Sequence, residues 1–177
     1  MKQTNGQHLI SIFEEWAPRS LAVEGDSVGL QIGRLDKLVT KVLVTLDVND
    51  EVVDEAIEQG CQLIIAHHPP IYSKLKNIRT DMPQGRLFEK LIKHDIAVYA
   101  AHTNLDIATG GVNDLLAEAL KLENISILEP TTSENLIKLE VFTPKEATET
   151  VRKALAEAGA GNIGDYNSCS FTTSGEG

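Results

Sequence analysis

The first run of apolar residues along the chain has the spacing of a helix. Between residues 6 and 16 the large apolar side chains recur at intervals of three and four positions, at Leu9, Ile10, Phe13 and Trp16. This spacing places them along one stripe of a helix. Pro18 follows, and a proline cannot continue a helix because it lacks the backbone N–H. We therefore predict an amphipathic helix over residues 6–16 that packs on a core.

From Lys41 the pattern changes to an alternation of strands and helices. Residues 41–48 (KVLVTLDV) are β-branched and apolar, residues 50–60 (DEVVDEAIEQG) have helical spacing closed by a glycine, and residues 61–67 (CQLIIAH) are apolar again. A helix, a strand with its exit loop, and a further helix are predicted at residues 85–95, 96–106 and 111–121. Because the apolar runs alternate little, both strand faces should be covered. We predict a largely parallel three-layer α/β lobe over residues 1–130.

The regular alternation loosens after Leu122, and residues 130–133 (PTTS) have the composition of a linker. Beyond them the pattern predicts a strand, a helix with a glycine stop and a second strand, at residues 135–144, 145–161 and 165–174. A single strand-helix-strand unit is thin for an independent core. We therefore expect residues 131–177 to dock on the first domain or to be an incomplete part of a larger module.

Composition narrows the classes of function. Hydrophobic residues make up 42% of the chain, which is enough for a real core, and the formal net charge is −10. This charge is opposite to that of a general nucleic-acid binder, so a nucleic-acid partner is not expected. The first residues lack the apolar core of a signal peptide, and no stretch approaches the ~18 apolar residues of a membrane span. We predict a cytoplasmic protein without a membrane partner.

Side chains that can bind metal follow three consecutive predicted strands. The first strand ends at Asp47, the second at His67 and His68, and the third continues through His102 and Asp106. Loops that leave the carboxyl ends of neighbouring parallel strands converge, so these side chains should lie close together. Neutral imidazole and carboxylate are suitable ligands for Zn, Mn, Fe, Co or Ni. The sequence therefore predicts a metal site, although Asp47 could equally cap the helix that follows it.

The two adjacent histidines raise a geometric question. On a regular strand His67 and His68 would point to opposite faces, so sharing one site requires the chain to turn there, and the two prolines that follow favour a turn. Alternatively the pair serves two neighbouring ions about 3.5–4 Å apart, with a carboxylate such as Asp106 between them, as in two-metal hydrolases. The competing interpretation is one packing and one solvated histidine; His102 and Asp106 in the next exit loop weaken it.

A second polar segment is residues 23–33, VEGDSVGLQIG, in which Glu24 and Asp26 precede Gly29 and Gly33. The segment could bring carboxylates beside a metal, or its glycines could shape a hairpin turn, which the spacing favours. Glu24 and His102 are the candidates for moving protons. The sequence contains no nucleophile elbow, no phosphate-binding P-loop and no dinucleotide-binding fingerprint. Cys61 and Cys169 are far apart, so they indicate neither a disulfide framework nor a thiolate zinc site.

Three segments together resemble a known family. Residues 19–33 (RSLAVEGDSVGLQIG), 63–72 (LIIAHHPPIY) and 100–120 (AAHTNLDIATGGVNDLLAEAL) are similar, in order and spacing, to the NIF-three-like family, whose bacterial members are called GTP cyclohydrolase I type 2 homologues. The resemblance covers about residues 5–125. It implies a dinuclear site in which His67, His68 and Asp106 match family ligands and His102 lines the same cavity. It also implies a toroidal homohexamer.

In that family the remaining ligands, a His and a Glu, come from a second α/β lobe, and this sequence lacks that motif. Some members insert a ferredoxin-like α+β domain, similar to P-II and CutA-type folds, and residues from about 135 resemble its beginning. The implied function is a dinuclear metal-dependent hydrolase with two divalent ions (Zn, Fe or Mn, with Zn favoured) that acts on GTP or a related purine nucleotide. The alternative is a metal-binding hexameric scaffold or regulatory protein whose inserted domain senses a small molecule.

Overall fold

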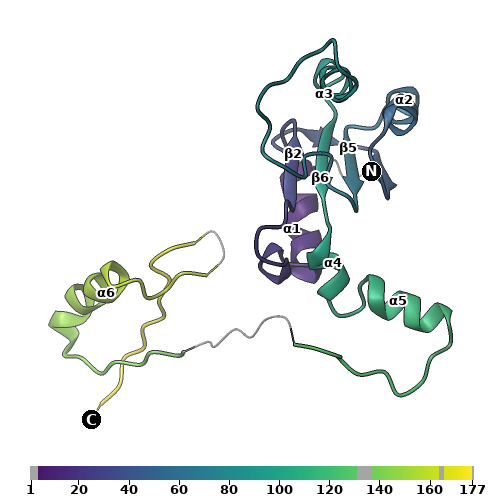
Figure 1. Ribbon diagram of the computed structural model, residues 1–177. Coiled ribbons are helices and arrows are strands. Elements are labelled where there is room, and N and C mark those ends of the chain that lie inside the picture. Colours follow the sequence, from purple (N-terminus) through teal and green to yellow (C-terminus); the bar gives the residue numbers. More distant parts are fainter. Residues whose placement is uncertain (1–3, 131–136, 164–165, 177) are drawn as a thin grey trace. The chain divides into compact units, whose positions relative to one another are not determined.

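The computed structural model describes residues 4–130, 137–163 and 166–176. The chain divides into two compact units, Met1–Thr132 and Ser133–Gly177, which run from purple to green and from green to yellow in Figure 1. Within the described residues, no helix combines the length and the apolar composition needed to cross a membrane.

The first unit contains a four-stranded sheet with the strand order β2-β6-β5-β4. Strands β4, β5 and β6 are parallel, and β2 pairs antiparallel with β6. The strands are β2 (Gly29–Ile32), β4 (Val42–Thr45), β5 (Leu63–Ala66) and β6 (Ala97–Ala100), and a small separate sheet pairs β1 (Thr4–Asn5) with β3 (Leu38–Val39). The helices are α1 (Gly6–Trp16), η1 (Arg19–Leu21), α2 (Asp50–Glu58), α3 (Pro83–Lys93), α4 (Thr103–Ile107) and α5 (Val112–Ala119). The prediction of a mixed α/β fold with a mostly parallel sheet is confirmed.

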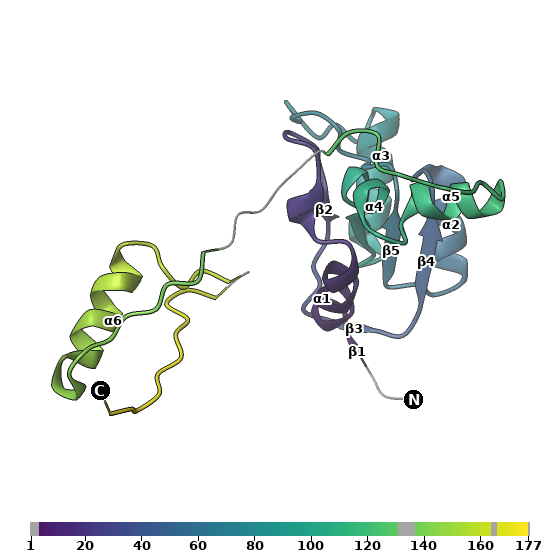
Figure 2. The same cartoon turned by 90° about the horizontal axis from the view of Figure 1, so that it is seen from below.

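Helices cover both faces of this sheet. Successive residues of a strand point to opposite faces, and the two faces of β5 and β6 belong to two different apolar clusters. Ile64 and Val98 pack with side chains of α2 and α3, whereas Leu63 and Tyr99 pack with Ile10 of α1. This double cover explains the apolar runs without alternation. Figure 2 views the sheet from the end at which α4 and α5 lie.

Local sequence sets the ends of several elements. The helix expected over residues 6–16 is α1, and the Asn5 side chain accepts a hydrogen bond from the Gln7 N–H at 2.8 Å. The Asn49 side chain accepts in the same way from the Val52 N–H at the start of α2, at 2.9 Å. Pro83 begins α3, where a missing N–H costs nothing. These local signals fix the residues at which α1, α2 and α3 begin.

Two elements differ from the sequence-based expectation. Residues 103–107, expected in an exit loop, form the short helix α4, which continues from β6 in Figure 1. Residues 29–32, expected in a glycine-shaped hairpin turn, form strand β2 after a turn over Val23–Asp26. The reason lies in the tertiary structure. Without β2, the backbone groups along one edge of β6 would lack partners, and antiparallel pairing with β2 satisfies them. The glycines at both ends of β2 interrupt the pattern of apolar and polar residues, so this pattern does not reveal the strand.

The second unit contains helix α6 (Thr148–Glu157), preceded by η2 (Lys145–Ala147). The strands predicted at residues 135–144 and 165–174 are not formed in their described parts, residues 137–144 and 166–174, where the only pairing is the single bridge between Ile163 and Tyr166. A strand needs a neighbour that satisfies its backbone groups, and Phe142 and Phe171 stay exposed. A ferredoxin-like fold for this unit therefore stays a prediction. Most of the predicted linker, residues 131–133, lies outside the described residues.

Candidate metal centre

Three imidazoles meet where β5 and β6 end. Ala66 and Ala100 are paired across these two parallel strands, so the residues that follow each strand come side by side. The chain bends at His67 and His68 directly after β5, and His102 follows β6. The centre of the His67 ring lies 5.1 Å from the centre of the His68 ring and 5.1 Å from that of the His102 ring. One ring nitrogen from each of the three histidines lies within 4.8 Å of the other two. The predicted convergence at the carboxyl ends of the strands thus places all three histidines in one cluster.

The backbone holds the adjacent pair in this position. The N–H of His67 donates to the Thr45 carbonyl at 3.0 Å, and the N–H of His68 donates to the Leu46 carbonyl at 2.8 Å. Both bonds are to the end of β4, so the segment stays against the sheet while its side chains turn together. The next residue, Pro69, is buried and cannot extend the ladder.

The hydrogen bonds of the three rings indicate which nitrogen of each ring carries the lone pair. In each ring Nδ1 faces an oxygen: the Ala101 carbonyl at 3.0 Å for His67, Asp47 Oδ1 at 2.8 Å for His68, and Asp26 Oδ1 at 2.9 Å for His102. A carbonyl oxygen and an ionised carboxylate only accept hydrogen bonds, so Nδ1 carries the proton of the neutral ring. The lone pair is then on Nε2 of all three imidazoles, as a metal ligand requires.

One carboxylate borders the imidazole cluster directly. Asp106 follows His102 by four residues, about one turn of α4, and its Oδ1 lies 3.6 Å from Nε2 of His67. Glu24 lies at the tip of the turn before β2 and is exposed. Among the described residues it has neither an ion pair nor a side-chain hydrogen bond to the histidines. The structure thus brings Asp106 to the cluster and leaves Glu24 at its margin.

Asp26 is the most enclosed acid near the cluster, with a side chain only 6% exposed. It accepts hydrogen bonds from His102 Nδ1, from the Thr103 N–H at 3.1 Å and from the Thr103 hydroxyl. Burial alone would raise the pKa of Asp26, but these bonds favour the ionised form and hold its pKa below the usual value. The sequence drew attention to Asp26 through its segment only; the histidine it serves is 76 residues away.

The donor set fits a divalent transition metal ion. Three imidazole nitrogens with free lone pairs and a neighbouring carboxylate are ligands that zinc, iron and manganese accept. The hydrogen bonds at Nδ1 are the outer contacts that commonly orient metal-binding histidines. The cluster of His67, His68 and His102 could therefore hold a metal ion.

Comparison with known proteins identifies the family. Residues 4–172 match the family described as Duf34/NIF3 (NGG1p interacting factor 3). The chain belongs to this family. The Bacillus subtilis protein called GTP cyclohydrolase 1 type 2 homolog is 60% identical over 176 residues, which are 99% of this chain and 47% of that protein. The Halalkalibacterium halodurans protein of the same name is 57% identical over the whole of this chain and 48% of its own.

Solved structures agree with this assignment. The Bacillus cereus protein related to NIF3 is 55% identical with a TM-score of 0.74, and the match covers 100% of this chain and 49% of that chain. Reduced HcgD from Methanocaldococcus jannaschii is 37% identical with a TM-score of 0.65, over 69% of this chain and 49% of that chain. The chain thus spans about half the length of the curated Duf34/NIF3 relatives it matches. The family resemblance read from the sequence is confirmed; ligation by His67, His68 and Asp106, and proton transfer by Glu24 or His102, stay predictions.

Proposed function

We propose that this Duf34/NIF3 chain supplies half of a dinuclear metal centre in a hydrolase of the GTP cyclohydrolase 1 type 2 kind, which acts on a purine nucleotide. The observation that carries the proposal is the convergence of three imidazoles beside Asp106, each with one ring nitrogen within 4.8 Å of those of the other two and with Nδ1 on an oxygen partner. The name shared by the curated relatives supports the reaction class. We propose a cytoplasmic protein that assembles as a homohexameric ring.

In this proposal His67, His68 and Asp106 hold two divalent ions, with zinc favoured, and ligands from outside these residues complete the shell. Bound ions of this kind supply Lewis acidity toward water and substrate oxygens. His102 accepts a proton at Nε2, since its Nδ1 is hydrogen-bonded to the Asp26 carboxylate, which also stabilises the imidazolium that forms. Glu24 is exposed on the adjacent turn, where its carboxylate can exchange that proton with solvent.

Metal content and nucleotide turnover of matched variants test the proposal. We expect the wild-type chain to retain zinc after dialysis, and His68→Ala and Asp106→Ala to lose it because each removes a ligand. His94→Ala is the control, because His94 is exposed at the end of α3, outside the cluster. Turnover of GTP should fall with the metal. Unchanged metal content and unchanged turnover in both ligand variants would rule the proposal out.

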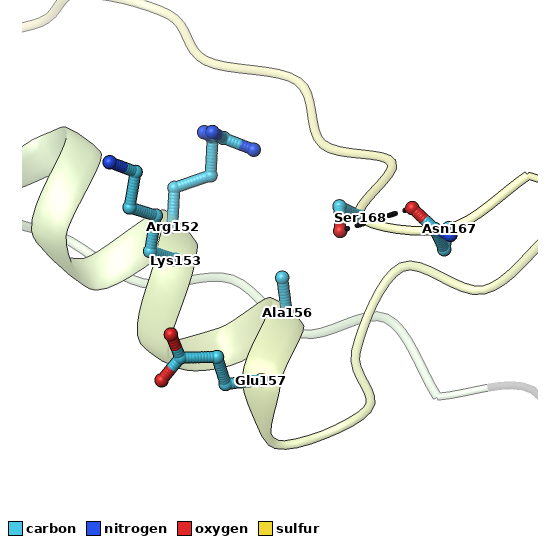
Figure 3. Close-up of a pocket in the computed structure, with 6 residues that line it drawn as sticks. All are labelled: Arg152, Lys153, Ala156, Glu157, Asn167 and Ser168. Atoms are coloured by element: carbon cyan, nitrogen blue, oxygen red, sulfur yellow. Dashed lines mark hydrogen bonds between the residues drawn. The ribbon is translucent and has the colours of Figure 1, made fainter.

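A hollow in the second unit supports a second candidate, a metal-binding scaffold or regulator that senses a small molecule. The hollow has a volume of about 450 Å³ and lies between α6 and the segment at residues 167–168 (Figure 3). Its lining is polar and of mixed charge, formed by Arg152, Lys153, Ala156, Glu157, Asn167 and Ser168, and Arg152 is also paired with Glu149. Thermal stabilisation by a nucleotide without product formation would favour this candidate.

A further inference from the structure

Asp26 and Asp47 accept hydrogen bonds from two histidines of the cluster, but their surroundings differ. The side chain of Asp47 is 63% exposed, so water competes for its bond to His68. The side chain of Asp26 is 6% exposed, and its oxygens are surrounded by donors from His102, Thr103 and the Ser27 N–H, the last at 2.8 Å. A buried carboxylate with this many donors has no freedom to turn away.

The Thr103 hydroxyl links the Asp26 carboxylate to the Val23–Asp26 turn. It donates to Asp26 and accepts a hydrogen bond from the Val23 N–H at 3.0 Å. The turn from Val23 to Asp26, closed by the Asp26 N–H bond to the Val23 carbonyl at 3.0 Å, is thereby held against the first residues of α4. Glu24 lies within this fastened turn.

We propose that Asp26 is a positioning residue: it holds the neutral His102 ring in the form protonated at Nδ1, so that the Nε2 lone pair faces His67 and His68, and it fixes the turn that presents Glu24. Its relevance to catalysis rests on the proposed function, in which the Nε2 lone pair of His102 takes up a proton. The orientation itself is a property of the metal-free chain and can be measured without any turnover.

The physical basis is the difference between a carboxylate and an amide. Ionised Asp26 accepts at both oxygens, which matches the N–H and O–H groups around it. Asparagine has one accepting oxygen and one donating NH₂, so in Asp26→Asn a donor must face another donor at His102 or at Thr103. If the amide oxygen stays with Thr103, the NH₂ group faces His102, and His102 is then driven to the form protonated at Nε2.

The test is nitrogen-15 NMR of the imidazoles in the full metal-free chain at about pH 8, where histidine is largely neutral. In wild type we expect His102 to be protonated at Nδ1. Asp26→Asn should lose this signature at His102 and keep it at His68, whereas Asp47→Asn should do the reverse. Thr103→Val removes the hydroxyl that fastens the turn but not the Asp26 to His102 bond, so it should lower stability and keep the Nδ1–H form.

Several outcomes overturn the inference. If the neutral His102 ring of the wild-type chain is protonated at Nε2, the inference is wrong, even if Asp26→Asn fails to fold. An unchanged His102 signature in a folded Asp26→Asn variant would also overturn the inference. A loss of the signature in Thr103→Val equal to that in Asp26→Asn shows that Asp26 acts only through the turn. Unchanged metal content and turnover in His68→Ala and Asp106→Ala, together with the expected NMR pattern, would refute the proposed function and leave the positioning role intact.

Discussion

Gly33 directly follows strand β2, at a point where the chain passes close to the start of β6, the strand that leads to His102. Its φ is +80°, and a Cβ added there would lie 2.9 Å from Ala97 Cα and 3.2 Å from the Ile96 carbonyl oxygen. Both neighbours are main-chain atoms, one in β6 and one in the residue before it, and they cannot rotate away as a side chain would. We expect Gly33→Ala to be among the more damaging glycine substitutions in the first unit.

The cost of this substitution has two parts. Placing alanine in the left-handed region costs about 1–2 kcal/mol. Forcing the backbone of β6 to shift adds a cost of the size found for overpacked cores, about 1–3 kcal/mol. The sum, about 2–5 kcal/mol, is a large part of the 5–15 kcal/mol that typically separates folded from unfolded domains. Gly60→Ala is the matched control, because Gly60 has φ +65° but no atom within 4 Å of its added Cβ, so it carries only the first part.

Urea unfolding followed by tryptophan fluorescence measures both variants in the unit concerned. Trp16 is the single tryptophan of the chain, and its Nε1 donates to the Thr109 carbonyl at 2.9 Å, so the signal reports on the first unit alone. Gly33→Ala should lower the unfolding free energy by about 1–3 kcal/mol more than Gly60→Ala, the difference being the contact with β6. Equal losses would show that the β2 edge yields freely and would refute the reasoning.

Three further predictions concern charge, capping and metal. Burial and a hydrogen bond to Glu14 raise the pKa of Tyr99, so the folded chain keeps this proton after the unfolded chain has released it. The stabilisation by Tyr99 is therefore complete below about pH 10 and declines as the pH rises further. Tyr99→Phe should cost about 1.5–3 kcal/mol at pH 7 and should show a smaller decline of the urea midpoint above about pH 10 than wild type; parallel pH profiles would contradict this. Asn49→Ala removes the cap of α2 and should lower the unfolding free energy by about 1 kcal/mol, whereas Asn49→Asp should retain it; equal loss in both would argue against capping. Zinc at 100 times its dissociation constant should stabilise the first unit by about 2.7 kcal/mol, reversibly with a chelator, and no shift in the thermal midpoint would count against a metal site.

The sequence located the candidate site through the strand ends, and the structure supplied the partners. His67, His68 and His102 could be predicted to meet because parallel strands bring their carboxyl ends to one edge, whatever the loops do. The hydrogen bonds that His68 donates to Asp47 and His102 donates to Asp26 join residues 21 and 76 positions apart. No local pattern encodes which acid reaches which ring, because that choice depends on how β2 and its turn dock beside β6.

The sequence by itself determined the elements whose signal is periodic. Helices α1, α2, α3 and α5 follow from the helical spacing of apolar residues, because one stripe of each helix is buried, and strands β4, β5 and β6 follow from apolar runs with little alternation. Only the tertiary structure decided β2 and α4, whose short segments carry neither a helical spacing of apolar residues nor an unbroken apolar run. β2 pairs with the edge of β6 that would otherwise lack a partner, and α4 places Asp106 four residues after His102, with its Oδ1 3.6 Å from His67 Nε2. The candidate ligands could thus be recognised from the local sequence, but their orientation depends on contacts between segments far apart in the chain.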